Sequence, residues 1–333
     1  MLSGSFALTI AIVVLALIFD FINGFHDSAN AIATSVSTRV LTMKEAVLMS
    51  AFFNFAGAFM NVKVAQTIGK GLIDPSIISQ HVVISGLLAA IIWNLLTWYF
   101  GIPSSSSHAL IGGLIGAAIT SAKSFTIIYW VNFLWKVVLW LFLSPIIGFI
   151  IGYIFMNILN FLLKDKKPSW VTKFFSKAQV ASAMLMALNH GGNDAQKSMG
   201  VITMALLSGG IISYFYIPQW VKISCAAAMA LGTMIGGKKI IKTMGHNMAK
   251  LAPVNGFAAE TGAAAVIFTA TMFNAPVSTT HIISTSIMGV AASKRMSSVR
   301  WIVARNIVQA WVITIPVCAL IAAAVVFILG NFF

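Results

Sequence analysis

Residues 23–31 read NGFHDSANA and residues 190–198 read HGGNDAQKS, so the chain carries two related polar segments with an Asp beside Gly and Asn. A second pair consists of PSSSSH at 103–108 and PVSTTH at 276–281, where Pro precedes hydroxyl residues and a His. The members of each pair are separated by nearly the same number of residues. This arrangement predicts that the chain is built from two repeats, each of which supplies half of a polar site.

Outside these segments the chain is strongly apolar. Hydrophobic residues make up 59% of it, charged residues only 8%, and the mean hydropathy is +0.95. Soluble domains carry roughly 25% charged residues, so the composition excludes an ordinary soluble globule. Because a span needs about 20 residues, a chain of 333 residues can cross the bilayer on the order of ten times. We therefore predict an all-α polytopic membrane protein.

The basic residues indicate topology. The chain has 21 Lys and Arg against 7 Asp and Glu, a net charge of +14, and most cations lie in short loops between apolar runs. Such loops are retained in the cytoplasm, so this excess does not indicate a nucleic-acid-binding surface. The stretch 164–178 is the most basic and is predicted to be a cytoplasmic linker between a first repeat, 1–163, and a second, 179–333. Only two Cys are present, so no disulfide framework is expected.

The apolar runs predict a set of helices with interruptions at the polar motifs. Spans are expected at 5–24, 45–61, 77–100, 126–162, 179–207, 219–236, 254–273 and 301–329. Shorter segments that follow the motifs, at 25–38, 104–121 and 277–293, are expected to be broken or re-entrant half-helices. Irregular backbone at membrane depth requires protein or water partners, so the motifs should mark an interior cavity. Inverted-topology repeats are favoured, although parallel repeats also occur.

Asp27 and Asp194 are the first candidate site residues. A carboxylate inside a membrane segment costs at least about 2.5–3.5 kcal/mol, so it normally faces a cavity or a partner. Asn30 and Lys197 follow one helical turn later at equivalent positions. Asp with Asn offers oxygen ligands to a hard cation such as Na⁺, whereas Asp with Lys forms an ion pair or leaves the Lys to meet an anion. Capping of a short helix is the structural alternative. The coupling-cation candidates are Asp27, Asn30, Asp194, Asn193 and Glu260.

The hydroxyl runs after Pro103 and Pro276 predict an anion site. Pro and Ser or Thr commonly begin helices, so simple capping is the structural alternative. A helix N-terminus also presents free N–H groups and a partial positive charge that bind phosphate or carboxylate. Two such ends facing each other would surround a tetrahedral oxyanion. The substrate candidates are Ser105, Ser106, Ser107, Ser278, Thr279, Thr280 and Lys197.

Other polar residues within apolar segments are weaker candidates. His108 and His281 end the hydroxyl runs and could relay protons or, as neutral rings, orient the loops. Glu260 is a lone acid in an apolar segment and should face the cavity, with a structural pair to a Lys as the alternative. The remaining candidates are Asn23, His190, Gln196 and Asn54.

No enzymatic site is predicted. The segment GTMIGGKK at 232–239 lacks the final Ser or Thr of a phosphate-binding loop and follows no predicted strand. The sequence contains no evident metal-ligand cluster or set of nucleophile, base and acid. We therefore expect no cofactor, no resident metal and no ATP hydrolysis by this chain.

With these motifs the chain resembles the inorganic phosphate transporter family over essentially its whole length. The family signature Gly-x-Asn-Asp-x-x-Asn-Ala is similar to residues 24–31 and, more loosely, to residues 191–198. Its Pro-x-Ser-[Ser/Thr]-[Ser/Thr]-His loops are similar to 103–108 and 276–281. The resemblance implies a plasma-membrane secondary transporter of the bacterial branch, with two inverted repeats and a homodimeric assembly. It also implies phosphate uptake coupled to a cation, with the Asp motifs and the hydroxyl loops lining the sites.

Departures from the family pattern bear on the coupling cation. His26 replaces the first Asn of the motif, Lys197 replaces the later Asn, and Asn54 stands where eukaryotic relatives carry Glu. These features resemble the bacterial low-affinity branch, which is associated with protons and with metal–phosphate complexes. A Lys beside a Na⁺ site also disfavours Na⁺ electrostatically. We therefore expect H⁺ symport by alternating access, with Na⁺ coupling or a sulfate or other oxyanion permease as alternatives and a channel as the least favoured.

Overall fold

The computed structural model describes residues 2–73 and 78–330, and within these ranges the chain is helical apart from turns, loops and one isolated bridge between Ile73 and Ile128. The elements of the first half are α1 (Leu2–Ser37), α2 (Met43–Gly57), α3 (Lys63–Lys70), α4 (Gln80–Phe100), α5 (Ser106–Ala122), α6 (Trp130–Phe133), the π-helical turn η1 (Leu134–Val138) and α7 (Leu139–Leu163). Those of the second half are α8 (Pro168–Ser208), α9 (Gln219–Ile235), α10 (Lys238–Lys242), the π-helical turn η2 (Thr243–Asn247), α11 (Pro253–Met272), α12 (Thr279–Ala292), the 3₁₀ turn η3 (Met296–Ser298) and α13 (Trp301–Gly330). The predicted all-α fold is confirmed.

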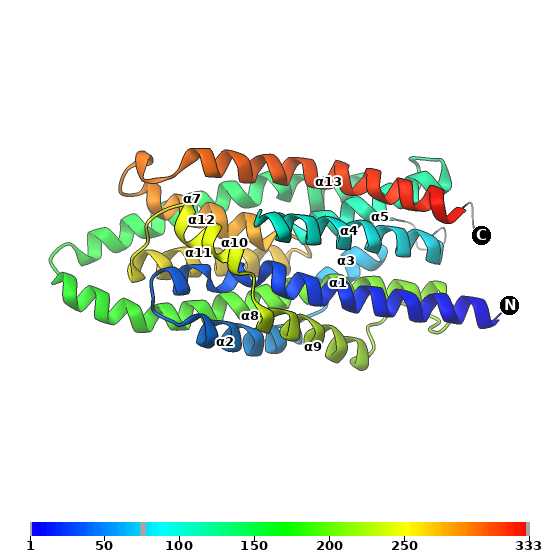
Figure 1. Cartoon of the computed structure of the whole chain (residues 1–333), viewed down its shortest axis with the longest axis horizontal. Coiled ribbons are helices and arrows are strands. Elements are labelled where there is room, and N and C mark those ends of the chain that lie inside the picture. The colour runs from blue at the N-terminus through cyan, green and yellow to red at the C-terminus, as the bar shows by residue number, and fades with distance from the viewer. Residues whose placement is uncertain (1, 74–77, 331–333) are drawn as a thin grey trace.

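The helices of the two halves interlock. Helix α1 packs against α8 and α9, α2 packs against α8, α5 packs against α13, and α12 packs against α7. Helices α1 and α8 run in opposite directions along the long axis of the molecule (Figure 1). Their opposite directions agree with an inversion of the repeats, which stays a prediction.

The polar motif at 23–31 does not break its helix. The predicted half-helix at 25–38 is wrong as a separate segment, because α1 continues unbroken from Leu2 to Ser37. No Pro interrupts this stretch, and Gly24 remains helical because its missing side chain lets α1 approach the backbone of α9 at Met229 and Thr233. By contrast, α5 and α12 are short helices that begin within the hydroxyl motifs, as predicted.

Two other predicted segments are more continuous than expected. The run at 126–162 forms one long helix from Trp130 to Leu163, and its irregular turn lies at η1 instead of at Pro145. The basic stretch at 164–178 is mostly helical, because α8 begins at Pro168. Pro suits the first turn of a helix, since a backbone N–H at that position would have no partner within the helix. The loop between the two halves is therefore short.

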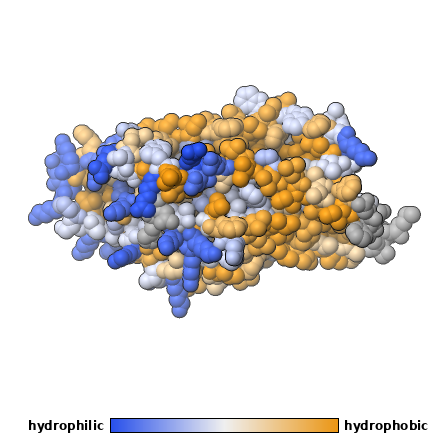
Figure 2. Space-filling model, turned by 45° about the horizontal axis from the view of Figure 1, so that its top comes forward, coloured by the Kyte–Doolittle hydropathy of each residue, from blue (hydrophilic) through white to orange (hydrophobic). Residues whose placement is uncertain are grey.

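The surface divides into an apolar belt and a basic end. Four helices are long and apolar enough to cross a membrane, and the pair α9 and α10, bent by 65°, would make a fifth among the described residues. Figure 2 shows hydrophilic side chains gathered at one end of the long axis, the end at which α7 meets α8, and apolar side chains over much of the rest. By the positive-inside rule this basic end is predicted to be cytoplasmic.

Helices α2 and α8 cross where both carry glycine. A Cβ on Gly191 would collide with the backbone of Asn54, and one on Gly57 would collide with the backbone at Leu188 and Gly192. This close approach brings the polar segment of α8 against α2 and leaves no room for a side chain.

We expect Gly191→Val to lower the melting temperature of the purified protein, because overpacking a tight helix contact typically costs about 1–3 kcal/mol. Gly330→Val is the matched control, since nothing lies within 4 Å of a Cβ at that position. Thermal unfolding of both variants in detergent measures the effect. Equal melting temperatures for the two variants would show that the α2–α8 crossing tolerates separation.

Candidate functional site

The two hydroxyl loops start helices with the same cap and meet inside the protein. Ser105 Oγ accepts the backbone N–H of His108 at 3.2 Å at the start of α5. Ser278 Oγ accepts that of His281 at 3.3 Å at the start of α12. Ser107 Oγ donates to the backbone oxygen of Val277 at 3.0 Å, so the loops touch. Each loop therefore caps its own helix, as the structural alternative predicted, and the two loops also contact each other inside the protein.

Asp27 of α1 lies between the two loops. Its Oδ2 accepts a hydrogen bond from Ser106 Oγ at 2.8 Å, and its Oδ1 accepts one from Thr280 Oγ1 at 3.4 Å. The Nδ1 atom of His26 lies 2.7 Å from Oδ1. One carboxylate is thus in contact with a hydroxyl from each half of the chain.

Asp194 of α8 occupies the corresponding place in the second half. Its Oδ2 accepts from Thr279 Oγ1 at 3.4 Å, and its Oδ1 lies 2.5 Å from Lys197 Nζ. Lys197 also donates to Ser107 Oγ. The Lys therefore joins the second carboxylate to the first hydroxyl loop, and it is fully buried.

Asn30 and Lys197 occupy equivalent motif positions and make equivalent contacts. Asn30 Nδ2 donates to Thr279 Oγ1 at 3.1 Å and to Thr280 Oγ1 at 3.0 Å. Lys197 donates to Ser107, so each side chain reaches the hydroxyl loop of the other half. The replacement of Asn by Lys changes the charge at this position while the geometry of the contact is kept.

The centre is closed to solvent in this structure. The candidate side chains named from the sequence are each at most 2% exposed. Water therefore does not compete for their hydrogen bonds, and charges placed there interact more strongly than they would in water.

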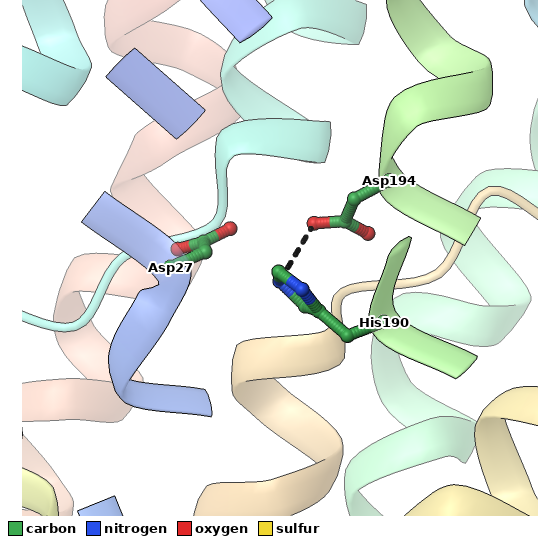
Figure 3. Close-up of side chains that lie close together, drawn as sticks. All are labelled: Asp27, His190 and Asp194. Carbon is green, nitrogen blue, oxygen red and sulfur yellow. Dashed lines mark ion pairs between the residues drawn. The ribbon is translucent and has the colours of Figure 1, made fainter. Parts of the chain in front are cut away.

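A third residue, His190 of α8, lies beside both carboxylates. Figure 3 shows its ring between Asp27 and Asp194, with the ion pair to Asp194 drawn; His190 Nε2 is 3.5 Å from Asp194 Oδ2. Ligand atoms of the three residues lie within 4.8 Å of one another, close enough to hold a metal ion. Asn54 Oδ1 lies 3.0 Å from His190 Nδ1 and orients the ring. Spacing along the chain does not indicate this group, because it is assembled from two distant helices.

Glu260 lies in a separate polar cluster between α1, α8 and α11. Its carboxylate accepts from Ser35 Oγ at 2.8 Å and from Gln179 Nε2 at 3.2 Å, and also from the hydroxyls of Thr34 and Ser182. No Lys pairs with it among the described residues. The structural alternative of a Lys pair is therefore not realised, and hydroxyl and amide donors hold the carboxylate instead.

Two further candidates contact elements around the centre. Asn193 Nδ2 donates to Thr271 Oγ1 of α11 at 2.8 Å. Gln196 Oε1 accepts the backbone N–H groups of Val64 and Ala65, at 2.8 and 3.3 Å, and so caps the start of α3. These contacts fix helix packing around the centre.

The two loop histidines lie side by side behind the hydroxyls. Their ring centroids are 5.0 Å apart, and His281 stacks on Trp311 of α13 at 3.9 Å. Trp311 Nε1 in turn donates to the backbone oxygen of Pro103 at 3.1 Å. The aromatic stack thus connects both loops to α13.

Sequence reasoning misses His26, because the second motif has no His at the equivalent position. Its Nε2 lies 3.0 Å from Thr97 Oγ1 of α4 and 3.4 Å from Ser104 Oγ, while its Nδ1 meets Asp27. Adjacency to Asp27 in the sequence is the signal that could have indicated this role. Asn23, by contrast, is buried and makes no hydrogen bond through its side chain.

Comparison with known proteins gives consistent matches. A family model described as "Phosphate transporter family" matches residues 23–322. The "Probable low-affinity inorganic phosphate transporter" of Bacillus subtilis (strain 168) is 50% identical over 329 residues, which cover 98% of each chain. A protein of the same description from Rhizobium meliloti (strain 1021) is 50% identical over 321 residues and 96% of each chain.

A solved structure shares the fold. It is described as "The sodium-dependent phosphate transporter", and it aligns with a TM-score of 0.88 over 98% of this chain and 100% of its own. The two sequences are 24% identical, so this similarity bears on the arrangement of the helices alone.

Proposed function

We infer the function of this chain from its family and its site. The chain belongs to the phosphate transporter family. We propose that it imports inorganic phosphate together with a cation by alternating access. The family predicted from the motifs is thereby confirmed, and with it a transport protein of the cell membrane. The observation that carries the proposal is the meeting of two capped helix N-termini between two buried carboxylates. Such ends present N–H and hydroxyl donors to an oxyanion.

The charges at the centre support coupling to a cation. Asp27, Asp194 and Lys197 together contribute two negative charges and one positive charge within a buried volume. Phosphate would add at least one further negative charge, and an uncompensated charge inside a membrane is costly. A cation that enters with phosphate removes this cost, so neither partner binds well without the other.

We favour the proton as the coupling cation. Lys197 already pairs with Asp194, and its positive charge repels Na⁺ from the second half-site. Protonation of a carboxylate needs no cage of oxygen ligands. Na⁺ symport remains the alternative that the same carboxylates could serve, and the homodimer stays a proposal from the family resemblance.

A specific observation also favours a second form of the substrate. Asp27, His190 and Asp194 come close enough to hold a divalent ion beside the hydroxyl loops. Carboxylate and imidazole groups are common ligands of such ions. Transport of a metal–phosphate complex would place the metal on these three residues, with the phosphate against the two helix N-termini.

Phosphate uptake into proteoliposomes tests the function. We expect the purified protein to accumulate phosphate under a pH gradient, with an alkaline interior, and not under a Na⁺ gradient at constant pH. Addition of Mg²⁺ at fixed pH gradient reports on a metal–phosphate substrate, and excess sulfate reports on selectivity. Uptake driven by Na⁺ alone would contradict the proposed proton coupling, and strong inhibition by sulfate would indicate a general oxyanion permease.

A further inference from the structure

Asp20 is a buried acidic residue that belongs to neither pair of repeated motifs. It lies in α1, seven residues before Asp27, and is fully buried. Neither of its carboxylate oxygens accepts a hydrogen bond of normal geometry, and the nearest polar side chains are those of Ser198 and Cys225. An ionised carboxylate without donors is strongly disfavoured away from water, so this side chain needs a proton or a cation.

The surroundings of Asp20 contain other polar groups without partners. Both side-chain polar atoms of Asn23, one turn further along α1, are buried and unpaired, and so is Ser198 Oγ of α8. Ser198 and Cys225 of α9 lie beside Asp20, and Asp194 and Lys197 of α8 are the charged groups that interact with it at longer range. Lys197 is already engaged by Asp194 and Ser107, so it is not free to pair with Asp20.

Asp20 belongs to a line of polar side chains along one face of α1. Its members recur every three or four residues, which places them on the same helical face, and each is at most 2% exposed: Asp20, Asn23, Asp27, Asn30 and Thr34. With a rise of about 1.5 Å per residue, Asp20 and Thr34 each lie about 10 Å along the axis from Asp27. Thr34 donates to Glu260. The line therefore connects three carboxylates: Asp20, Asp27 and Glu260.

The position of Asp20 along α1 sets its side of the site. Helix α1 ends at Ser37, close to the basic end that is predicted to face the cytoplasm, and Arg39 follows two residues later. Helix α1 runs toward this basic end from the opposite end of the molecule (Figure 1), so Asp20, which precedes Asp27 in the helix, lies farther from the basic end than Asp27 does. Glu260 accepts a hydrogen bond from Thr34, which follows Asp27 in α1, so it lies toward the basic end and the phosphate centre is flanked by one carboxylate in each direction.

We propose that Asp20, with Asn23 and Ser198, is the site at which the coupling proton binds on the outer side of the phosphate centre. The inference rests on the proposed proton-coupled function and names the residue that carries the proton. The carboxylate takes one proton from outside water, and the resulting O–H donates to the unpaired oxygen of Asn23 or Ser198. The proton leaves when the inner side opens, which restores the carboxylate. A proton suits this place better than Na⁺, because the neighbouring Cys225 sulfur is a poor ligand for a hard cation.

Asp20→Asn is the test, because it removes the titrating group and keeps the shape. In proteoliposomes we expect phosphate accumulation driven by a pH gradient to fall at least about tenfold, as for loss of a proton relay. Exchange of labelled for unlabelled phosphate at equal pH should stay within about twofold of wild type, because the neutral amide has the same charge as the protonated carboxylate and so still offsets the buried charge of phosphate. Asp20→Glu should restore accumulation. Asp165→Asn, the same change in an exposed loop, is the matched control.

The two failures can be told apart. If wild-type protein does not respond to the pH gradient, the proposed proton coupling fails and the role of Asp20 fails with it. If wild type responds and Asp20→Asn accumulates phosphate equally well, only the inference about Asp20 is overturned. Loss of exchange as well as accumulation, in a variant that elutes as a single folded species, would also overturn it and would assign Asp20 to phosphate binding or to packing.

Discussion

Asp27→Asn is expected to abolish phosphate uptake while the protein still reaches the membrane. The amide keeps the shape of the side chain and can still accept from Ser106, which limits structural damage. It removes the negative charge that faces both hydroxyl loops and His26. Hydrogen bonds to a charged group are worth about 1.5–3 kcal/mol each, so loss of the charged set predicts a fall of about 100-fold or more in uptake.

Asp194→Asn is expected to have the same effect with a greater loss of stability. The change leaves the Lys197 ammonium buried without its carboxylate, and breaking a buried pair typically costs about 3–5 kcal/mol. Uptake should be normalised to the amount of protein in the membrane, with melting temperature measured in parallel. Asp165→Asn serves as the control for both variants. Normal uptake by either variant would remove that carboxylate from the site.

The helices that the sequence predicts well are those bounded by unambiguous signals. The short helices α5 and α12 follow a Pro and a hydroxyl cap, and the structure begins them at Ser106 and Thr279. The predicted break near residue 25 fails for a physical reason. Gly24, polar neighbours and a membrane setting suggested irregular backbone, whereas tertiary packing on α9 stabilises the continuous helix. Local sequence does not report the presence of that neighbour.

The centre of the site could be predicted because its residues belong to motifs that occur twice in the sequence. Asp27, Asp194 and the two hydroxyl loops stand out as pairs, and the structure brings these pairs together. Residues without a counterpart in the other repeat cannot be identified by this comparison, and His26 and Asp20 are examples. The donors around Glu260 also come from three helices, and nothing in their spacing indicates that they converge on one carboxylate.

Lys197→Asn is a third variant for which we expect a large effect. It gives the second motif the amide that Asn30 provides in the first, so the hydrogen bond to the opposite loop can be retained in kind. The buried positive charge is lost, and Asp27 and Asp194 then face the incoming phosphate without a resident cation. Proton-driven uptake in the absence of Na⁺ should fall by at least about 100-fold, because breaking a buried pair typically costs about 3–5 kcal/mol.

The same change should make transport depend on Na⁺. An Asp beside an amide oxygen offers the ligands that a hard cation prefers, and the repelling ammonium is absent. We expect NaCl, compared with choline chloride at equal concentration and equal pH gradient, to stimulate uptake by Lys197→Asn and to leave wild type unchanged. Lys197→Arg keeps the charge and should show no Na⁺ dependence. Unimpaired uptake by Lys197→Asn without Na⁺ would mean that the broken symmetry of the motifs does not determine which cation drives transport.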